Sequence, residues 1–449
     1  MKTVFLFVSN YVYSSDFLRT EYIRYLSVYY RVIVFAPSGL FEGGKPYFVS
    51  PNVVYVKWNV QSPRFWSIFG KLFRYSLIRK YDFEPVVKRN RERGLKNWHR
   101  KMLWFFSHLF PKNFWNPDFF LRLEILLAPR SFSFERSIEK YKPAIVLTAS
   151  PGFNHFDAEA IVLAKRAGIK TAAINFSWDN LHNGGIHFRR TDYLLVWNEV
   201  IRQTAINEYG YSPHRVLVSG IIRFDHYFKS PPNNNNREAF LKSKGLNPDA
   251  KTILLTTTTD GNYPDEDIVL DNLIQARMAG RFPNFPNIFV RMHPKENITK
   301  FMRFSHDSSF QNICIEKAGT DREVNLGSAT ELSEEDLDNL KYTLEYSDVI
   351  VNYASTITLE AFAFDKPVIN INYPQQYERA YSFRHYKPIV DAGAVRLPKS
   401  FNDLVSDINS YLKNPEKDKF ARESIVEKLI GHRDGLSYKR SVDLLLNII

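Results

Sequence analysis

The sequence predicts an α/β protein with two Rossmann-like domains that face a cleft. Apolar runs of four to six residues alternate with amphipathic helical segments along most of the chain. This alternation is typical of a parallel sheet with helices on both faces. It falls into two blocks separated by a polar stretch, and 449 residues are long for one domain and natural for two.

The first block, residues 1–228, is the expected N-terminal domain. Its opening apolar run spans about six residues and lacks a small-residue cleavage site, so it is interpreted as a first strand rather than a signal peptide. The expected strands are 3–9, 32–35, 53–58, 144–148, 171–176, 193–197 and 216–219, and the expected helices are 15–29, 158–167 and 201–208.

A basic, aromatic insertion interrupts this block at about residues 61–130. Between Gln61 and Arg130 the chain has 15 Lys and Arg against 5 Asp and Glu, and it holds four of the seven tryptophans. Aromatic and basic residues alternate there at roughly helical spacing, which favours amphipathic helices on an anionic membrane surface. The alternative is a solvated basic face over an aromatic core. No DNA- or RNA-binding motif is evident.

The polar stretch 229–248, with two prolines and four consecutive asparagines, is predicted to be a linker. The second block, residues 249–400, is the expected C-terminal domain, followed by helices over 401–449. Its expected strands are 252–257, 287–291, 312–316, 349–352 and 368–371, and its expected helices are 267–278, 334–346 and 358–364. Ligands of such sheets bind at the carboxyl ends of the strands.

Composition excludes several classes of protein. The single cysteine, Cys314, rules out an intrachain disulfide and a cysteine-based zinc site, and it favours a reducing cytosol. No run of 18 or more uncharged apolar residues would span a bilayer. The sequence also shows no Asp-X-Asp motif in a suitable place, so no metal site is predicted.

The most informative segment runs from Glu345 to Ile371. A strand is followed by a hydroxyl-rich helix start with Ser355 and Thr356, and Glu360 lies one turn into the helix. Free N–H groups at a helix start favour anions, and a carboxylate just beyond can accept hydrogen bonds from ribose hydroxyls. An ordinary strand–helix–strand unit with a hydroxyl cap is the alternative.

A second cluster follows the strand 287–291. Pro294 ends this strand, so His293 and Lys295 would project toward the ligand edge, where both can neutralise phosphate oxygens. Two weaker donor-binding candidates come from other strand ends. They are Thr258, in a threonine run after the first strand of the second block, and Arg223, after the last strand of the first block.

His293-Pro294, the Ser355–Glu360 helix and Lys366-Pro367-Val368 together resemble the nucleotide-binding domain of GT-B glycosyltransferases of bacterial surface-polysaccharide biosynthesis. The chain looks similar to CDP-glycerol glycerophosphotransferase-like proteins and to HP-motif transferases that use CMP-sugars. The resemblance implies a CMP-, CDP- or UDP-linked donor as substrate, no cofactor and no metal. It also implies that the donor contacts His293, Lys295, Ser355, Thr356 and Glu360.

Candidate bases lie in the first block, after strands that would end at the cleft. An inverting transferase needs a base beside the acceptor hydroxyl, and Asp, Glu or His can serve. Asp179 in the stretch Ser177-Trp178-Asp179-Asn180 is the first candidate, although it can instead serve as a turn residue. The reserves are His155, Asp157 and Asp16.

The predicted function is transfer of a sugar or polyol phosphate from a nucleotide-activated donor to a glycan or lipid-linked acceptor. The enzyme is expected in the cytoplasm, on the inner face of the cell membrane, with residues 61–130 on the anionic lipid and no nucleic-acid partner. One alternative is a UDP-sugar 2-epimerase of the same fold, although that family's paired glycines are absent at Ala354-Ser355. Another is a non-catalytic membrane-associated binding protein.

Overall fold

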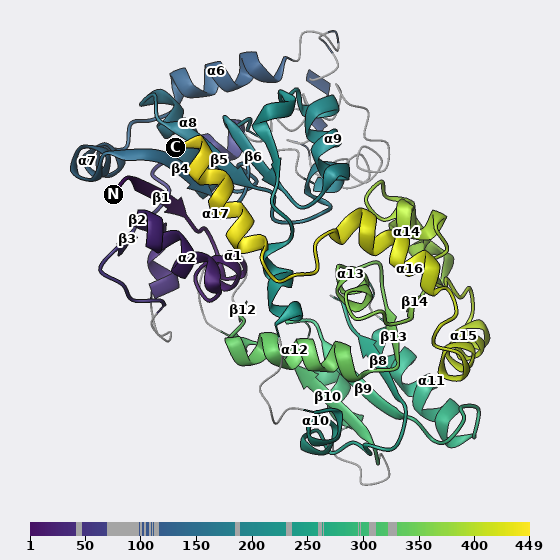
Figure 1. The fold of residues 1–449 in the computed structure, drawn as a ribbon. Coiled ribbons are helices and arrows are strands. Elements are labelled where there is room, and N and C mark those ends of the chain that lie inside the picture. Colours follow the sequence, from purple (N-terminus) through teal and green to yellow (C-terminus); the bar gives the residue numbers. More distant parts are fainter. Residues whose placement is uncertain are drawn as a thin grey trace. The chain divides into compact units, whose positions relative to one another are not determined.

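The computed structural model contains two compact units, each with its own parallel sheet (Figure 1). The first unit combines Met1–Arg223 with Leu436–Ile449, and the second lies within Phe224–Gly435. The structure describes residues 1–41, 47–69, 98, 101–102, 105–106, 109, 111, 116–184, 189–229, 236–258, 263, 265–294, 296, 298–304, 311–321 and 330–449.

The first unit is built on a seven-stranded sheet of order β3-β2-β1-β4-β5-β6-β7, and every pair of neighbouring strands is parallel. Because the chain winds outward in both directions from β1 and β4, the order reverses between these two strands. The strands are β1 (Thr3–Phe7), β2 (Arg31–Ala36), β3 (Val53–Lys57), β4 (Pro143–Thr148), β5 (Lys170–Ile174), β6 (Tyr193–Val196) and β7 (Val216–Val218).

Alternating residues of these strands bury both faces of the sheet. Val4 and Leu6 of β1 contribute to one apolar cluster, whereas Phe5 and Phe7 contribute to another on the opposite face. The second cluster is aromatic, and the rings of Phe7 and Phe35 stack with centroids 4.6 Å apart. A sheet covered on both faces explains why its strands are continuous apolar runs in the sequence.

Helices and short helical turns of the first unit cover this sheet. One predicted helix, 15–29, is two helices in the structure, because Thr20 caps a new helix by accepting a hydrogen bond from the Tyr22 N–H at 3.3 Å. The elements are α1 (Tyr11–Phe17), α2 (Glu21–Tyr29), η1 (Ser38–Phe41), α6 (Pro117–Leu127), α7 (Phe132–Tyr141), α8 (His155–Arg166), η3 (Asn180–Gly184), α9 (Glu199–Tyr209), η4 (Pro213–Arg215) and α17 (Ser437–Ile448).

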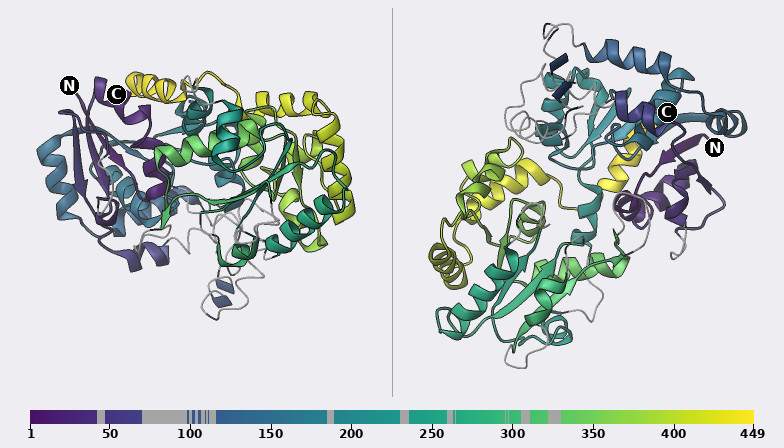
Figure 2. Two further views of the ribbon diagram at one scale, coloured as in Figure 1. Left: turned by 90° about the horizontal axis from the view of Figure 1, so that it is seen from below. Right: turned by 180° about the vertical axis from the view of Figure 1, so that it is seen from behind.

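The chain returns to the first unit at its end. Helix α17 packs against α2, and Val442 and Leu445 join the apolar cluster of β1. Lys2 donates a hydrogen bond to the Ile449 carbonyl at 2.6 Å, so the two termini lie side by side (Figures 1 and 2). The sequence grouped 401–449 as C-terminal helices and did not separate α17 from the helices before it.

Both ends of the basic insertion are anchored in the first unit. Trp66 is fully buried and donates its indole N–H to Glu159 at 2.7 Å. Glu124 of α6 forms a buried ion pair with Arg189, whose guanidinium also donates to the Gly152 carbonyl at 3.0 Å. Trp66 is therefore a core residue and not part of an exposed apolar face, which corrects the expectation for this tryptophan. Most of the predicted insertion, including residues 70–97, lies outside the described residues.

The second unit holds a parallel sheet of order β10-β9-β8-β13-β14, which reverses between β8 and β13. Ile253, Ile288 and Val349 pack in its core. The strands are β8 (Thr252–Thr256), β9 (Asn287–Met292), β10 (Ile313–Lys317), β13 (Val349–Asn352) and β14 (Val368–Asn370), with a separate antiparallel pair β11 (Thr320–Asp321) and β12 (Thr330–Glu331).

Helices surround this sheet as well, and α10 lies inside the predicted linker 229–248. The Phe240 ring of α10 stacks on Phe289 of β9 with centroids 6.3 Å apart, so this part of the stretch belongs to the second unit. The elements are η5 (Ile222–Phe228), α10 (Arg237–Ser243), α11 (Glu266–Met278), η6 (Ile298–Phe304), α12 (Glu334–Tyr346), α13 (Ile357–Phe362), η7 (Gln375–Ser382), α14 (Lys387–Asp391), α15 (Phe401–Lys413), α16 (Lys419–Ile425) and η8 (Val426–Ile430). Among the described residues, no helix is long and apolar enough to cross a membrane.

Candidate functional site

Polar side chains of the first unit gather where its strand order reverses. Ser9 and Asn10 follow β1, and Asn154 follows the neighbouring strand β4. The Asn154 amide donates to the Ser9 hydroxyl at 2.8 Å, which ties the two strand ends together. Asn10 and Asn154 are also the N-caps of α1 and α8. In open α/β sheets this reversal point is where ligands bind, so the network marks one candidate site edge.

Asp157 is buried in the same network. Its Oδ2 accepts hydrogen bonds from the Ser150 hydroxyl and, at 3.0 Å, from the Asn154 amide, while Oδ1 has no hydrogen-bond partner among the described residues. Burial raises the pKa of the Asp157 carboxyl to about 7, although the bonds from Ser150 and Asn154 lower it. A carboxyl with this pKa can exchange a proton near neutral pH. Its complete burial, however, keeps it from direct contact with a substrate.

The charges of three predicted carboxylates raise the pKa of one buried hydroxyl, that of Tyr13. Burial raises the pKa of Tyr13 far above its usual value, and the charges of Asp157, Asp16 and Asp179 raise it further. The Tyr13 ring also meets the Phe176 ring edge-on with centroids 4.6 Å apart. The structure thus brings together three candidates that the sequence places on three different segments.

Asp179, the first candidate base, takes part in hydrogen bonds within its own loop. It lies half-buried after β5, its Oδ1 accepts a hydrogen bond from the Ser177 hydroxyl at 2.5 Å, and its carbonyl accepts one from the His182 N–H at 3.0 Å. His155, another reserve candidate, is the exposed first residue of α8. Of these two side chains, Asp179 is half-buried and His155 is exposed.

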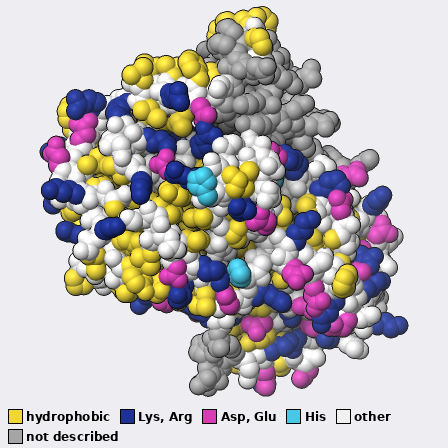
Figure 3. All heavy atoms as spheres, turned by 45° about the horizontal axis from the view of Figure 1, so that its top comes forward, with side chains coloured by type: hydrophobic (Ala, Val, Ile, Leu, Met, Phe, Trp, Pro, Cys, Tyr) yellow, Lys and Arg dark blue, Asp and Glu magenta, His cyan; other side chains and the backbone are white. Residues whose placement is uncertain are grey.

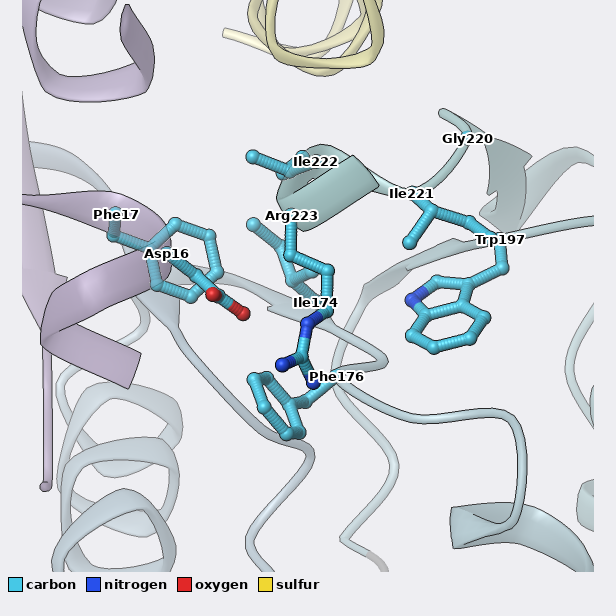
Figure 4. Close-up of a pocket in the computed structure, with 9 residues that line it drawn as sticks. All are labelled: Asp16, Phe17, Ile174, Phe176, Trp197, Gly220, Ile221, Ile222 and Arg223. Carbon is cyan, nitrogen blue, oxygen red and sulfur yellow. The ribbon is translucent and has the colours of Figure 1, made fainter. Parts of the chain in front are cut away.

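Asp16 and Arg223 line one small pocket of the first unit (Figure 4). The guanidinium of Arg223 lies over the Phe176 ring, 5.5 Å from its centroid. From the sequence, Asp16 is expected as a reserve base and Arg223 as a donor-binding residue, and the aromatic wall is not expected. Trp197 directly follows β6, and this position at a strand end could have been used to predict it as a pocket residue. The full lining is Asp16, Phe17, Ile174, Phe176, Trp197, Gly220, Ile221, Ile222 and Arg223.

In the second unit, adjacent strands deliver the predicted donor residues to one edge. Thr258 follows β8 and His293 follows β9. The His293 backbone N–H donates to the Thr257 hydroxyl at 2.8 Å, which joins the two strand ends. The Thr258 N–H donates to the buried carboxylate of Glu266. Lys295, also predicted to bind the donor, lies outside the described residues.

Ser355 and Thr356 follow β13, the strand next to β8, and are half-buried. The Ser355 hydroxyl accepts from the Ile357 N–H and donates to the Asn352 side chain, both at 3.2 Å. Helix α13 begins at Ile357 and has only six residues. The hydroxyl-rich start is therefore present, and the helix that follows it lies within one or two residues of the predicted 358–364.

Glu360 is 2 % exposed, and one of its oxygens accepts a hydrogen bond from the Tyr227 hydroxyl at 2.7 Å. This bond joins α13 to η5 within the second unit. A second buried network fixes the same helix, because Thr358 and Tyr386 share a hydrogen bond of 2.6 Å. The structure thus gives Glu360 an internal partner that the sequence did not indicate, and its contact with ribose stays a prediction.

Within the described part of the chain, no group of three or more His, Cys, Asp or Glu side chains is arranged to hold a metal ion. The groups at the two sheet edges are instead hydroxyls, backbone N–H groups, a histidine, an arginine and carboxylates. Such groups bind phosphates and hydroxyls directly.

The overall fold is shared with solved GT-B proteins at low sequence identity. A UDP-GlcNAc 2-epimerase from Neisseria meningitidis bound to UDP-GlcNAc superposes with a TM-score of 0.58 at 14 % identity, over 100 % of both chains. A structure described as S. aureus MnaA with UDP gives 0.56 at 14 % identity, covering 100 % of this chain and 98 % of the other. The wall teichoic acid polymerase TagF gives 0.52 at 11 % identity, covering 99 % and 88 %. These likenesses confirm the predicted GT-B fold.

Sequence comparisons give the family. No curated protein matches the chain. The model of the family described as CDP-Glycerol:Poly(glycerophosphate) glycerophosphotransferase matches residues 170–447, more than half of the chain. This match confirms the resemblance seen in His293-Pro294 and Ser355–Glu360 and the prediction of a nucleotide-dependent transferase. The chain therefore belongs to the CDP-Glycerol:Poly(glycerophosphate) glycerophosphotransferase family and has the GT-B fold.

Proposed function

We propose that this protein transfers a polyol phosphate, or a sugar, from a nucleotide-activated donor to a hydroxyl of a glycan or lipid-linked acceptor in cell-surface polymer synthesis. The observation that carries the proposal is the delivery of Thr258, His293 and Ser355 to one sheet edge by three adjacent strands. The family to which this chain belongs is named for the transfer of glycerophosphate from CDP-glycerol, which supports the same proposal.

The second unit would bind the donor phosphates. Imidazole and hydroxyl groups donate hydrogen bonds to phosphate oxygens, and backbone N–H groups at strand ends add to them. His293 and Ser355 supply such groups, Thr356 adds a hydroxyl, and Lys295 would contribute a positive charge. Preorganised donors of this kind stabilise a departing nucleotide in place of a metal ion. CDP is the first candidate nucleotide, with CMP and UDP as the others.

The first unit would supply the base. Asp179 would take the proton of the acceptor hydroxyl while the acceptor oxygen attacks the donor. With a CDP-linked polyol, a bond forms from this oxygen to the phosphorus next to the polyol, and the bond from that phosphorus to CMP breaks. CMP then leaves with the electron pair. Asp16 and His155 remain the reserve candidates for the base, whereas the completely buried Asp157 would position its neighbours.

Nucleotide binding tests this function most directly. We expect CDP, CMP or UDP to raise the melting temperature of the protein, with GDP as the purine comparison. His293→Ala should weaken that binding ten- to a hundredfold, since hydrogen bonds to charged groups contribute about 1.5–3 kcal/mol. His432→Ala, at an exposed histidine of the second unit, is the matched control. If no nucleotide stabilises the unaltered protein, the proposal fails.

An epimerase of the same fold is the second candidate, because the Neisseria enzyme shares the architecture over its whole length. Such an enzyme converts its UDP-sugar without an acceptor. Incubation with UDP-GlcNAc alone, followed by NMR of the sugar, distinguishes the two activities. A new sugar epimer would favour the epimerase, whereas CMP release from CDP-glycerol that requires an acceptor would favour the transferase. A non-catalytic binding protein would show neither reaction.

We further propose that the first unit attaches to an anionic membrane surface through residues 61–130. Helix α6 exposes Phe119, Leu126 and Leu127, and Arg122 and Arg130 are exposed beside them. The face of the molecule drawn in Figure 3 carries hydrophobic side chains among Lys, Arg, Asp and Glu. Apolar and basic side chains on one face favour an anionic lipid surface. Sedimentation with anionic liposomes tests the attachment, and the absence of salt-sensitive binding would exclude it.

A further inference from the structure

The loop that carries the candidate base Asp179 is held at both ends by other elements of the first unit. It begins at Asn175, directly after β5, and leads into the short helical turn η3. The Asn175 N–H donates to the Leu195 carbonyl of β6 at 2.8 Å, and the Tyr209 hydroxyl of α9 donates to the Leu181 carbonyl of η3 at 2.7 Å. These anchors limit the conformations that the residues between them can adopt.

Two aromatic side chains anchor the middle of the loop. The Phe176 ring meets the Tyr13 ring edge-on with centroids 4.6 Å apart, and the Arg223 guanidinium lies over it, 5.5 Å from the ring centroid (Figure 4). Trp178 is buried. The polar residues of the loop alternate with these two rings along the chain, so the packing of the rings also fixes the backbone of the polar residues.

A hydrogen bond within the loop orients the Asp179 carboxylate. The Ser177 hydroxyl donates to Asp179 Oδ1 at 2.5 Å, and both side chains are half-buried. Hydrogen bonds to a carboxylate are stronger than those between neutral groups, and they favour the ionised form, which is the form that takes a proton. No described residue donates a hydrogen bond to Oδ2 of Asp179. Oδ2 is therefore the oxygen that can receive the proton of an acceptor hydroxyl.

Asn175 supports Ser177 from the end of β5. Its side-chain amide donates to the Ser177 carbonyl at 2.7 Å, and the Asn175 side chain is completely buried. Its Oδ1 is buried without a hydrogen-bond partner among the described residues. An unpaired buried oxygen lowers stability, so this arrangement points to a requirement other than stability. The orientation of Ser177 is the requirement that the contact serves.

The backbone of Asp179 is fixed as well. Its carbonyl accepts a hydrogen bond from the His182 N–H at 3.0 Å. With the backbone and Oδ1 both held, the carboxylate has one orientation before a substrate binds. A general base must lie within hydrogen-bond reach of the proton that it removes, and a misplacement of about 1 Å can lower a rate about a hundredfold. Orientation is thus the contribution that Ser177 can make to the reaction.

We propose that Ser177 is a positioning residue for Asp179. Its hydroxyl holds Oδ1 of the carboxylate and leaves Oδ2 for the acceptor hydroxyl, while Asn175 holds Ser177 in place from β5. The inference rests on the proposed function, in which Asp179 is the base. The acceptor proton moves to Oδ2 of Asp179, and the Ser177 proton stays on its own oxygen, hydrogen-bonded to Oδ1.

Steady-state kinetics of Ser177→Ala test this role. The rate of CMP release from CDP-glycerol is measured with a glycerophosphate polymer as the acceptor. We expect kcat to fall about ten- to a hundredfold while KM for each substrate stays within about twofold, because the variant loses the orientation of the base and no substrate contact. Ser177→Thr keeps the hydroxyl and should recover most of the lost kcat. Ser177→Cys, whose thiol is a weak donor, should give an intermediate kcat.

Ser27→Ala is the matched control. Ser27 is a buried serine of α2 in the same unit, and its hydroxyl donates to the Arg24 carbonyl at 2.8 Å. Like Ser177→Ala, this change removes one hydroxyl hydrogen bond from the first unit, but it does so outside the loop of Asp179. It should leave kcat unchanged.

A double-mutant cycle separates positioning from a structural role. If Ser177 acts only through Asp179, Ser177→Ala should lower kcat no further in a protein that already carries Asp179→Asn. If Ser177 merely stabilises the loop, Ser177→Ala should lower kcat by the same factor in both backgrounds. That additive result would overturn the proposal.

Other outcomes also decide the question. An equal kcat in Ser177→Ala and the unaltered protein contradicts the proposal. A higher KM at unchanged kcat would show that Ser177 binds a substrate instead of positioning the base, and the proposal would again be wrong. CDP should stabilise Ser177→Ala as it does the unaltered protein. An unaltered protein that neither binds CDP nor releases CMP would instead remove the proposed function itself.

Discussion

At the scale of single residues, the structure separates carboxylates that look alike in the sequence. Asp16, Asp157 and Asp179 all follow strands of the first unit, and all three charges raise the pKa of Tyr13. Asp157 is completely buried, Asp16 is 7 % exposed and lines a pocket, and Asp179 is half-buried in a loop. Each is therefore suited to a different task.

Replacing Asp179 by Asn tests its role as the base. An amide cannot take the acceptor proton, so kcat of transfer should fall by about 10²–10⁴-fold. Stabilisation by CDP should remain, because the donor contacts are proposed in the second unit. His155→Ala is the comparison, with a much smaller expected effect. Full activity in Asp179→Asn would assign the base to another residue.

Asp157→Asn should change how stability depends on pH. The folded pKa of about 7 lies above the roughly 3.9 of an unfolded Asp, so the folded chain binds the proton more tightly. The stability that the protonated Asp157 carboxyl contributes is therefore fully present below about pH 4. It is lost as the pH rises through about 7, at roughly 1 kcal/mol per pH unit. Glu159, with a pKa raised by burial to about 7, adds a loss of the same sign.

Urea midpoints at pH 5 and pH 8 measure this effect. We expect Asp157→Asn to lose less stability between the two pH values than the unaltered protein, while Glu159 maintains part of the decline. Asp249→Asn, at an exposed carboxylate, is the control and should behave like the unaltered protein. If the urea midpoints of all three proteins change equally between pH 5 and pH 8, burial does not shift the pKa of Asp157.

At the scale of elements, short turns at strand ends decide where functional side chains lie. Gly220 and Gly168 both have positive φ, +88° and +70°, but only Gly220 is crowded. Gly168→Ala should cost roughly 1–2 kcal/mol for the left-handed backbone alone. Gly220→Ala should cost about 1–3 kcal/mol more, since a methyl group there overpacks against Ser437.

Denaturant unfolding of the two variants measures the difference. Combining Gly220→Ala with Ser437→Ala removes the nearest atom, the Ser437 hydroxyl oxygen, and should recover part of the loss. Equal destabilisation by Gly220→Ala and Gly168→Ala would mean that α17 yields to the added methyl group.

Helix α6 combines a buried side with an exposed apolar side. Glu124 is bound to Arg189 in the core, whereas Leu126 is 77 % exposed. Replacing Phe119, Leu126 and Leu127 together by Ser should weaken binding to anionic liposomes, because less apolar surface enters the lipid interface. The matched control replaces three exposed apolar residues of the second unit, Ile268, Met278 and Phe285. Equal binding by both triple variants would exclude α6 as the attachment surface.

At the scale of the whole molecule, the chain is a GT-B transferase whose two units have separate cores. The second unit contains its own sheet and four of the residues proposed to bind the donor, Thr258, His293, Ser355 and Glu360. The chain enters it after Arg223 and leaves it after Gly435. This division suggests that donor recognition can be studied apart from acceptor recognition.

A fragment of residues 224–435 should therefore fold and keep CDP binding. Its apolar cluster lies within these limits, and so does the Tyr227 hydroxyl that bonds Glu360. Circular dichroism melting with and without CDP measures both properties. A folded fragment without a CDP shift, compared with an intact chain that has one, would show that residues of the first unit are needed for donor binding.

Much of the fold could be predicted from local patterns. Strand β13 spans Val349–Asn352 in the structure, as predicted, because a strand buried on both faces leaves a continuous apolar run in the sequence. The break between α1 and α2 was missed, although Thr20 followed by Glu21 is an N-cap pattern. Burial of Trp66 could not be predicted, because its partner Glu159 is 93 residues away.

The sequence by itself determined the α/β class, the positions of most strands along the chain and, through His293-Pro294 and Ser355–Glu360, the resemblance to the family. These features depend on neighbouring residues and on periodicity along the chain. Only the tertiary structure decided that Asp16 and Arg223 share a pocket, that Asp157 is buried, and that Glu360 bonds Tyr227. The physical reason is that contact and desolvation depend on which distant segments the sheets bring together, and residue spacing does not record this.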